Sequence, residues 1–354
     1  MAVLARFAPF LVLAATACGG SASDASDQAT DQNLTGAQHI SAGVERARQA
    51  RAGGVSPADV QRASVHLGNA YWLAQLSMLS YQDEHGIRAG LAAMGFSPQE
   101  FHFFESHCSD VFPTDSIAYY FSQADYSVLV YRGTLDWADW GTNFESTKVY
   151  WGGPGTVHYG FVSRFHALWD PHPDCGDKDG IAAVLAARHR IDPRTGKAPG
   201  GQLYVTGHSM GGALANLTLA HTQAEVCGDD VGCATAPRVD MSALYTFGSP
   251  KVGNETFAYA TAARARGRTP IYRFVNGDDV VTGIPRDLDP IESVISDYRH
   301  VGYAGEGEDI FQVWLGDRTM SISSFVLHLL VNKDDHLKYL PPLEFQAKAR
   351  NEMH

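Results

Sequence analysis

The sequence predicts an α/β fold, a mostly parallel sheet flanked by helices, and two observations carry this prediction. Helix-period patterns alternate along the chain with short runs rich in β-forming residues. Each of those runs ends at turn residues that include Gly133, Gly207, Gly248 or Gly277. Because functional groups of open α/β sheets gather at the carboxyl ends of the strands, we expect the functional site beside these turns.

The predicted elements follow in chain order. Residues 58–81 carry apolar side chains at helical spacing, most of which should pack in the core. Four β-rich runs follow, over residues 127–131, 203–206, 243–247 and 271–275. A second helix is predicted for residues 212–220, directly after the second β-rich run.

Composition and charge limit the classes of partner. Hydrophobic residues make up 45% and aromatic residues 11% of the 354 residues, so the chain can bury a sizeable core. The formal net charge of −12 argues against nucleic acid as a partner, because phosphates need Lys and Arg, and against electrostatic docking on anionic lipid. No window reaches the roughly 18 to 20 unbroken apolar residues of a membrane-spanning helix.

The first 17 residues have the features of a secretory signal, with an apolar run too short to span a bilayer. Small residues then lead to Cys18, and this junction resembles a bacterial lipoprotein lipobox, with Ala15 where Leu is usual. We therefore expect an exported protein, anchored in the cell envelope by a lipid on Cys18. The alternative is a plain secretion signal and a secreted protein. Residues 18–56 are predicted to hold this Cys and a flexible tether, and residues 57–354 a folded domain.

Four further cysteines follow Cys18, an even number that permits two disulfides in an exported protein. Cys227 and Cys233 lie close together in the sequence and are expected to close a small loop, which leaves Cys108 to pair with Cys175. The spacing does not resemble a zinc site, for which Cys-x-x-Cys pairs are expected.

The strongest local signal is Gly207-His208-Ser209-Met210-Gly211, which fits the Gly-x-Ser-x-Gly nucleophile elbow. In such an elbow a strand turns sharply into a helix, and the serine is held in a strained conformation with its hydroxyl exposed. Side chains two residues before and after the serine would collide, which explains both glycines. The β-rich run before the motif and the helical pattern after it support this interpretation of Ser209.

A serine hydroxyl needs a base to take its proton, and the base needs an acid to orient it. For the chain order Ser, acid, His, the candidate acids are Asp278 and Asp279, in the turn after the fourth β-rich run. The candidate bases are His300, His328 and His336. Turn carboxylates commonly bind their own backbone, and a lone His is more often a packing residue than a catalyst. Local reasoning therefore leaves both choices open.

Five segments carry a more specific pattern, and a sixth lies near the C-terminus. They are Val130-Tyr-Arg-Gly-Thr134 with Asp136-Trp137, Val157-His-Tyr-Gly-Phe161, Thr206-Gly-His-Ser-Met-Gly-Gly212, Tyr245-Thr-Phe-Gly-Ser-Pro-Lys-Val-Gly-Asn254, Arg273-Phe-Val-Asn-Gly-Asp-Asp-Val-Val281 and His336-Leu-Lys-Tyr339. Together they resemble the class 3 lipase family, α/β-hydrolases that include secreted fungal triacylglycerol lipases and plant phospholipases A1. The sequence departs from the family pattern at Lys251, where Arg is usual, and at Thr282, where Pro is usual.

The resemblance implies an α/β-hydrolase fold and resolves the open choices. It selects Asp279 as the acid, because the family acid lies three residues after the Asn of its segment. It selects His336 as the base, because the family's catalytic His lies in a His-Leu-x-Tyr segment near the C-terminus. It makes His300 a second family His with a structural role.

The reaction that the resemblance implies is hydrolysis of a lipid ester through an acyl-enzyme on Ser209. The oxyanion hole would consist of the backbone N–H of Met210, which follows the nucleophile, and of Thr134. No metal or organic cofactor is expected. Rival interpretations are a phospholipase A1, an esterase for short or aromatic acyl groups, a peptidase with the same triad, and a non-catalytic envelope lipoprotein.

Overall fold

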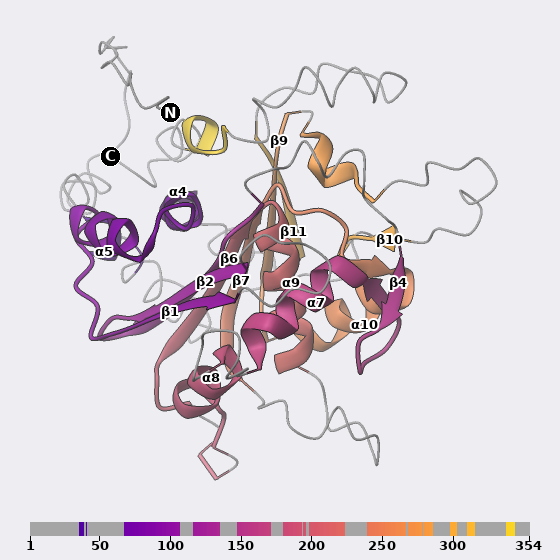
Figure 1. Cartoon of the computed structure of the whole chain (residues 1–354), viewed down its shortest axis with the longest axis horizontal. Coiled ribbons are helices and arrows are strands. Elements are labelled where there is room, and N and C mark those ends of the chain that lie inside the picture. Colours follow the sequence, from indigo (N-terminus) through magenta and orange to yellow (C-terminus); the bar gives the residue numbers. More distant parts are fainter. Residues whose placement is uncertain are drawn as a thin grey trace, which may run out of the picture.

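The computed structural model is built around one large sheet with helices on both of its faces (Figure 1). The residues it describes are 35–38, 40, 67–106, 116–134, 147–170, 180–192, 194–195, 198–223, 239–266, 268–277, 279–285, 298–302, 310–315 and 338–343. The predicted lipidation site, the four disulfide candidates and the predicted base His336 lie outside these residues.

The large sheet has the strand order β1-β2-β3-β6-β7-β9-β11. These strands are β1 Glu100–Ser106, β2 Ser116–Ser122, β3 Tyr126–Tyr131, β6 Gln202–His208, β7 Met241–Phe247, β9 Ile271–Asn276 and β11 Ile310–Leu315. Strands β1, β2 and β3 pair antiparallel, whereas every pairing from β3 to β11 is parallel. The predicted α/β-hydrolase fold, with a mostly parallel central sheet flanked by helices, is confirmed.

Two hydrophobic clusters cover the two faces of this sheet. One cluster includes side chains of α7 Tyr159–Trp169, α8 Ile181–His189, α9 Met210–Thr222 and α10 Glu255–Ala265. The other includes side chains of α4 Leu67–Leu79, α5 Glu84–Ala93 and residues 339 and 343. In Figure 1 these two groups of helices lie on opposite sides of the strands. The sheet is therefore buried on both faces, as parallel sheets usually are.

Strand β3 shows how the sequence produces this layering. Val128 and Val130 belong to one cluster, and Leu129 and Tyr131 belong to the other. Successive side chains of a strand point to opposite faces, so an unbroken apolar run suits a strand that is covered on both sides.

The four predicted β-rich runs are strands β3, β6, β7 and β9 of the sheet. The predicted helix at 58–81 corresponds to α4, which begins at Leu67, and residues 58–66 lie outside the described part. Helix α9 begins at Met210, two residues before the predicted start, because Ser209 itself is the N-cap. Nearly every residue of α9 is buried, which agrees with the absence of Asp, Glu, Lys and Arg from its sequence.

Residues 35–38 and 40 pack against the folded domain, although the sequence predicted a tether as far as residue 56. Ile40 is fully buried in the cluster that holds α4 and α5. The N–H of Gly36 donates to the carbonyl of Met94 at 3.0 Å, and the Tyr126 hydroxyl donates to the carbonyl of Ala37 at 3.2 Å. The packed part of the chain thus starts before the predicted boundary at residue 57, because one apolar side chain and a few backbone groups find partners there.

A second, four-stranded sheet has the order β10-β8-β5-β4 and is antiparallel. Its strands are β4 Lys148–Tyr150, β5 Thr156–His158, β8 Gly253–Asn254 and β10 Tyr298–Arg299. The side-chain oxygen of Asn254 accepts from the N–H of Phe257, which caps α10, and from the N–H of Thr156. Two segments of the family pattern, those of Val157 and Asn254, therefore meet in this sheet and have a structural role there.

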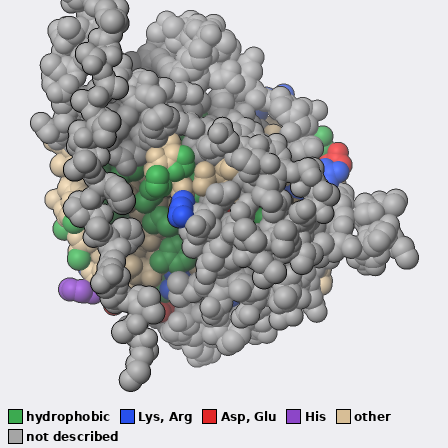
Figure 2. Space-filling model, turned by 90° about the horizontal axis from the view of Figure 1, so that it is seen from above, with side chains coloured by type: hydrophobic (Ala, Val, Ile, Leu, Met, Phe, Trp, Pro, Cys, Tyr) green, Lys and Arg blue, Asp and Glu red, His purple; other side chains and the backbone are tan. Residues whose placement is uncertain are grey.

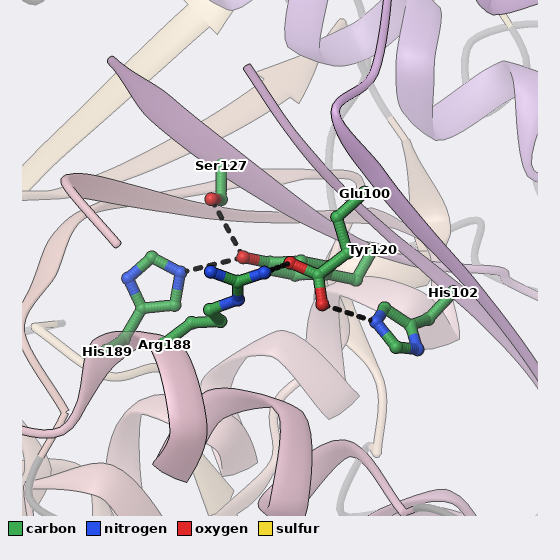
Figure 3. A network of polar contacts seen from close by, with 6 residues as sticks. All are labelled: Glu100, His102, Tyr120, Ser127, Arg188 and His189. Atoms are coloured by element: carbon green, nitrogen blue, oxygen red, sulfur yellow. Dashed lines mark hydrogen bonds and ion pairs between the residues drawn. The ribbon is translucent and has the colours of Figure 1, made fainter. Parts of the chain in front are cut away.

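A polar network ties the β1–β2 edge of the large sheet to the end of α8 (Figure 3). Glu100 pairs with Arg188 at 2.6 Å and with His102 at 2.8 Å. The Tyr120 hydroxyl donates to Ser127 at 2.8 Å and lies 3.0 Å from Nε2 of His189. Burial raises the pKa of Glu100, but the hydrogen bonds from His102 and Arg188 outweigh it and leave the pKa lowered.

None of the helices in the described part of the chain has the length and apolar character needed to cross a membrane. Within the same residues, no three His, Cys, Asp or Glu side chains are grouped so that they could hold a metal ion. Figure 2 shows hydrophobic side chains gathered in one area of the described surface, with a basic side chain at the edge of that area.

Candidate active site

Ser209 lies between β6 and α9, at the carboxyl end of a central strand. Its backbone has φ 58° and ψ −128°, and among the described residues it is the one non-glycine residue with positive φ. Its N–H donates to the carbonyl of Phe247, and its own carbonyl accepts the N–H of Gly212, both at 2.9 Å. Tertiary contacts therefore hold Ser209 in a strained conformation that costs about 1–3 kcal/mol.

The two elbow glycines are needed for different steric reasons. A Cβ on Gly207 would lie 2.3 Å from the backbone of Gly211, across the turn itself. A Cβ on Gly211 would lie 2.2 Å from the carbonyl oxygen of Tyr131, at the end of the neighbouring strand β3. The first collision agrees with the prediction from sequence, whereas the second arises from sheet packing that the motif alone does not contain.

Thr134 and Met210, the predicted oxyanion residues, lie side by side. The Thr134 hydroxyl donates to the sulfur of Met210 at 3.3 Å. Between Thr134 and strand β3 stands Gly133, where a Cβ would lie 3.0 Å from the Cβ of Ser209 and 2.7 Å from the carbonyl oxygen of His208. Only glycine lets the chain pass this close to the serine, so Gly133 brings Thr134 next to the elbow.

Asp279 follows β9, at the same edge of the sheet as Ser209, and its side chain is 4% exposed. Its Oδ1 accepts the N–H of Val281 at 3.0 Å and so caps the short 3₁₀ helix Val280–Gly283. Its Oδ2 accepts the hydroxyl of Tyr339 at 2.5 Å. The other candidate acid, Asp278, lies outside the described residues.

Residues 338 and 339 dock on the turn that carries Asp279, the predicted acid. The Asn276 N–H donates to the hydroxyl oxygen of Tyr339 at 3.1 Å, and the Asn276 side chain donates to the carbonyl of Lys338 at 3.1 Å. Burial, together with the nearby charge of Asp279, raises the pKa of Tyr339 well above its ordinary value, so the phenol stays protonated and able to donate. Tyr339, which follows the predicted base by three residues in the sequence, thus holds the C-terminal segment against Asp279.

His300, the rejected candidate base, is engaged elsewhere. Its Nε2 lies 2.7 Å from the carbonyl oxygen of Thr282, to which it donates. Burial and the charge of Arg273 lower its pKa well below its ordinary value. His300 therefore acts as a neutral donor to the loop after Asp279, in agreement with the structural role that the resemblance implies. His328 and His336 lie outside the described residues.

Residues 128–288 match the family model described as lipase (class 3). This matched segment contains Ser209, Asp279 and Thr134, and it ends before the C-terminal segment with Tyr339.

Two curated relatives match about half of this chain. The secreted mono- and diacylglycerol lipase 1 of Fusarium solani is 28% identical over 176 residues, which cover 49% of this chain and 41% of the relative. A chloroplastic phospholipase A(1) of Arabidopsis thaliana is 33% identical over 174 residues, which cover 45% of this chain and 33% of the relative. The chain thus spans less than half the length of these relatives. Among solved structures, the lipase of Rhizopus microsporus var. chinensis aligns with a TM-score of 0.49 and 19% identity, over 77% of this chain and 86% of that one.

One residue beside the elbow was missed by sequence reasoning. Tyr81, two residues after α4, brings its hydroxyl to 2.9 Å from Nδ1 of His208. No sequence signal points to Tyr81 beyond its place at the end of a predicted helix, because its partner lies 127 positions away.

Proposed function

We propose that this chain is a serine hydrolase that cleaves carboxylic esters of lipids, with triacylglycerol lipase-like activity. The observation that carries the proposal is the backbone of Ser209, held at positive φ between strand β6 and helix α9. Strain of this kind persists only where the surrounding structure imposes it, and it clusters at functional sites. The class 3 family match and the lipase names of the relatives support the same reaction class.

In the proposed mechanism, Oγ of Ser209 attacks the ester carbonyl while His336 takes its proton. His336 then returns that proton to the leaving alcohol, and an acyl-enzyme remains on Ser209. Asp279 orients the imidazole and stabilises the imidazolium that forms. Water, activated by the same imidazole, attacks the acyl-enzyme and releases the fatty acid.

The developing oxyanion needs preorganised donors, and two backbone N–H groups are proposed for this role. Met210 is the first residue of α9, where backbone N–H groups lack partners within the helix and favour negative charge. Thr134 stands against Met210 and supplies the second N–H. Loss of one such donor typically costs about 3–4 kcal/mol of barrier height.

The assignment of His336 as base is supported by the position of Tyr339. Three residues span at most about 10 Å, and Tyr339 contacts the carboxylate of Asp279 directly. The short separation along the chain between Tyr339 and His336 supports His336 as the base, whereas Nε2 of His300 is already bonded to Thr282.

The experiment that tests the proposal measures hydrolysis of p-nitrophenyl esters from acetyl to palmitoyl, with Ser209→Ala as the control. We expect activity that peaks at long acyl chains and falls at least about 1,000-fold in Ser209→Ala. A peak at short chains would instead support a short-chain or aromatic esterase. Activity that survives Ser209→Ala would refute the assigned nucleophile, and a complete lack of activity would favour the non-catalytic envelope lipoprotein.

A phospholipase A1 activity is the second candidate, and the match to the plant phospholipase A(1) favours it. Trioleoylglycerol emulsions and phosphatidylcholine vesicles, each assayed for released fatty acid, separate the two activities. We expect faster release from trioleoylglycerol; faster release of the sn-1 fatty acid from phosphatidylcholine would reassign the enzyme as a phospholipase A1.

The base is tested with a matched pair of histidine variants. His336→Gln is expected to lower kcat by at least about 100-fold. His300→Gln keeps an amide that can donate to Thr282 and should stay within about tenfold of the parent protein. The reverse order of the two effects would make His300 the base.

We further propose that the chain is exported and held in the cell envelope by a lipid on Cys18, with plain secretion as the alternative. The apolar start of the sequence and the small residues before Cys18 support this proposal. The name of the secreted Fusarium solani relative supports export alone. Partitioning into the detergent phase of Triton X-114 should be lost in Cys18→Ser; equal partitioning of both proteins would exclude the lipid anchor.

A further inference from the structure

Tyr81 stands where three parts of the proposed site meet, although it lies in neither the elbow nor the acid segment. Its hydroxyl is 2.9 Å from Nδ1 of His208, the residue before Ser209. The same hydroxyl lies 2.2 Å from the point where a Cβ on Gly133 would stand. That point is also 3.0 Å from the Cβ of Ser209. The Tyr81 hydroxyl, the Gly133 backbone and the serine thus surround one small volume.

His208 in turn is enclosed by aromatic rings. It meets Tyr81 edge-on with ring centroids 6.0 Å apart, and it meets Tyr339 edge-on at 5.8 Å. His208 is 1% exposed. Tyr339 also bonds Asp279. A continuous set of contacts therefore leads from Gly133, after strand β3, through Tyr81, His208 and Tyr339 to Asp279.

The chemical state of Tyr81 suits a fixed hydrogen bond. Burial raises its pKa above the ordinary value, and the charge of Arg132 and a backbone hydrogen bond with Gly133 offset this only in part. The phenol therefore keeps its proton at any pH at which the protein works, and it can bond His208 and the Gly133 backbone together.

We propose that Tyr81 is a positioning residue that holds the Gly133–Thr134 backbone in register with the Ser209 elbow through its contacts with Gly133 and His208. This inference rests on the proposed ester hydrolase activity. The oxyanion donors of Thr134 and Met210 come from separate elements, so they stabilise a tetrahedral adduct only while the two elements keep their spacing. Tyr81 joins these elements from its position two residues after α4, a helix on the opposite face of the sheet from α9.

The test compares Tyr81→Phe with Tyr71→Phe. Tyr71 lies in α4, the helix that ends two residues before Tyr81, and its hydroxyl accepts from the side chain of Gln75 at 2.8 Å. Tyr71→Phe is therefore a matched loss of one hydroxyl. For p-nitrophenyl butyrate we expect Tyr81→Phe to lower kcat about tenfold or more with KM changed less than about twofold. Tyr71→Phe should leave both constants within about twofold of the parent.

A second readout separates positioning from general stability. Phenylboronic acid forms a tetrahedral adduct with a nucleophilic serine, so its inhibition constant reports on the oxyanion donors. In Tyr81→Phe that constant should rise by the same factor by which kcat falls, while the melting temperature changes no more than in Tyr71→Phe. An unchanged inhibition constant, or a kcat within about twofold of the parent, would overturn the proposal.

His208→Phe removes the other partner of the same hydrogen bond. This variant takes the place of Tyr81→Phe in the test if Tyr81→Phe does not fold. It should lower kcat to a similar extent, and the double variant should lose no more than either single one, because residues that act as a unit are not additive. Additive losses would contradict a shared role. An inactive parent protein would refute the ester hydrolase proposal itself, whereas Ser209-dependent activity that Tyr81→Phe retains in full would refute the role of Tyr81 alone.

Discussion

The hydroxyl of Tyr339 donates to Oδ2 of Asp279 at 2.5 Å, across 60 positions of the sequence. Both side chains are buried, with Tyr339 1% and Asp279 4% exposed. This bond fastens Tyr339, three residues after the predicted base in the sequence, to the turn after β9. It also gives a buried carboxylate oxygen a donor in the absence of bulk water.

Tyr339→Phe should therefore lower both stability and turnover. Loss of the hydroxyl removes a donor from Asp279 and an acceptor from the N–H of Asn276. We expect the free energy of unfolding in urea to fall by about 1–3 kcal/mol and kcat to fall with it. Tyr150→Phe is the control, since this side chain is 67% exposed and its loss of a hydroxyl should change neither quantity. Equal effects of the two variants would argue against the role of the bond.

Ser209→Gly should be more stable than Ser209→Ala. Both variants lack the hydroxyl and should be inactive, but only glycine adopts φ 58° and ψ −128° without a steric penalty. After allowance for the greater freedom of glycine in the unfolded chain, we expect a difference of about 1 kcal/mol. Urea denaturation of the two proteins measures it. A more stable Ser209→Ala would show that the elbow is not strained.

Gly211→Ala should damage the fold itself. Its Cβ would lie 2.2 Å from the carbonyl oxygen of Tyr131, a backbone atom of a central strand that cannot turn aside. We expect a loss of at least about 2 kcal/mol of stability, measured by urea denaturation. Gly283→Ala is the matched control, because no atom lies within 4 Å of its Cβ position. A nearly neutral Gly211→Ala would show that β3 and α9 can separate at little cost.

Stability should fall as the pH drops from about 7 toward 4, with His189 a main contributor. Burial lowers its pKa to about 4 in the folded protein, against about 6.5 in the unfolded chain. A group with a lowered folded pKa contributes its full stability above the unfolded value, and this contribution is lost as the unfolded chain takes up the proton. His189 alone should cost about 2 kcal/mol between pH 7.5 and 4.5.

Urea denaturation of His189→Gln at these two pH values tests this expectation. The variant should lose less stability on acidification than the parent, even if it is less stable at pH 7.5. His85→Gln, which changes an exposed side chain, should follow the parent at both values. If His189→Gln keeps the full pH dependence of the parent, that dependence comes from other groups. One of them is His221, whose pKa burial also lowers to about 4.

Some features of the fold could not be predicted from the sequence. In strand β1 the consecutive residues Phe103 and Phe104 interrupt the polar–apolar alternation after four residues, so the antiparallel β1–β2 edge has no sustained period to detect. The strands of the small sheet are two or three residues long, shorter than any pattern of hydrophobicity can register.

The central strands and the elbow could be predicted because their causes are local. An apolar run such as that of β3 needs cover on both faces wherever it lies, and the collision at Gly207 arises within five residues of chain. The sequence by itself therefore determined the fold class and the place of Ser209. The contacts of Tyr81 with His208 and of Tyr339 with Asp279 join residues 127 and 60 positions apart. No local pattern encodes such pairs, because only the packing of α4 and the C-terminal segment against the sheet brings their hydroxyls to the site.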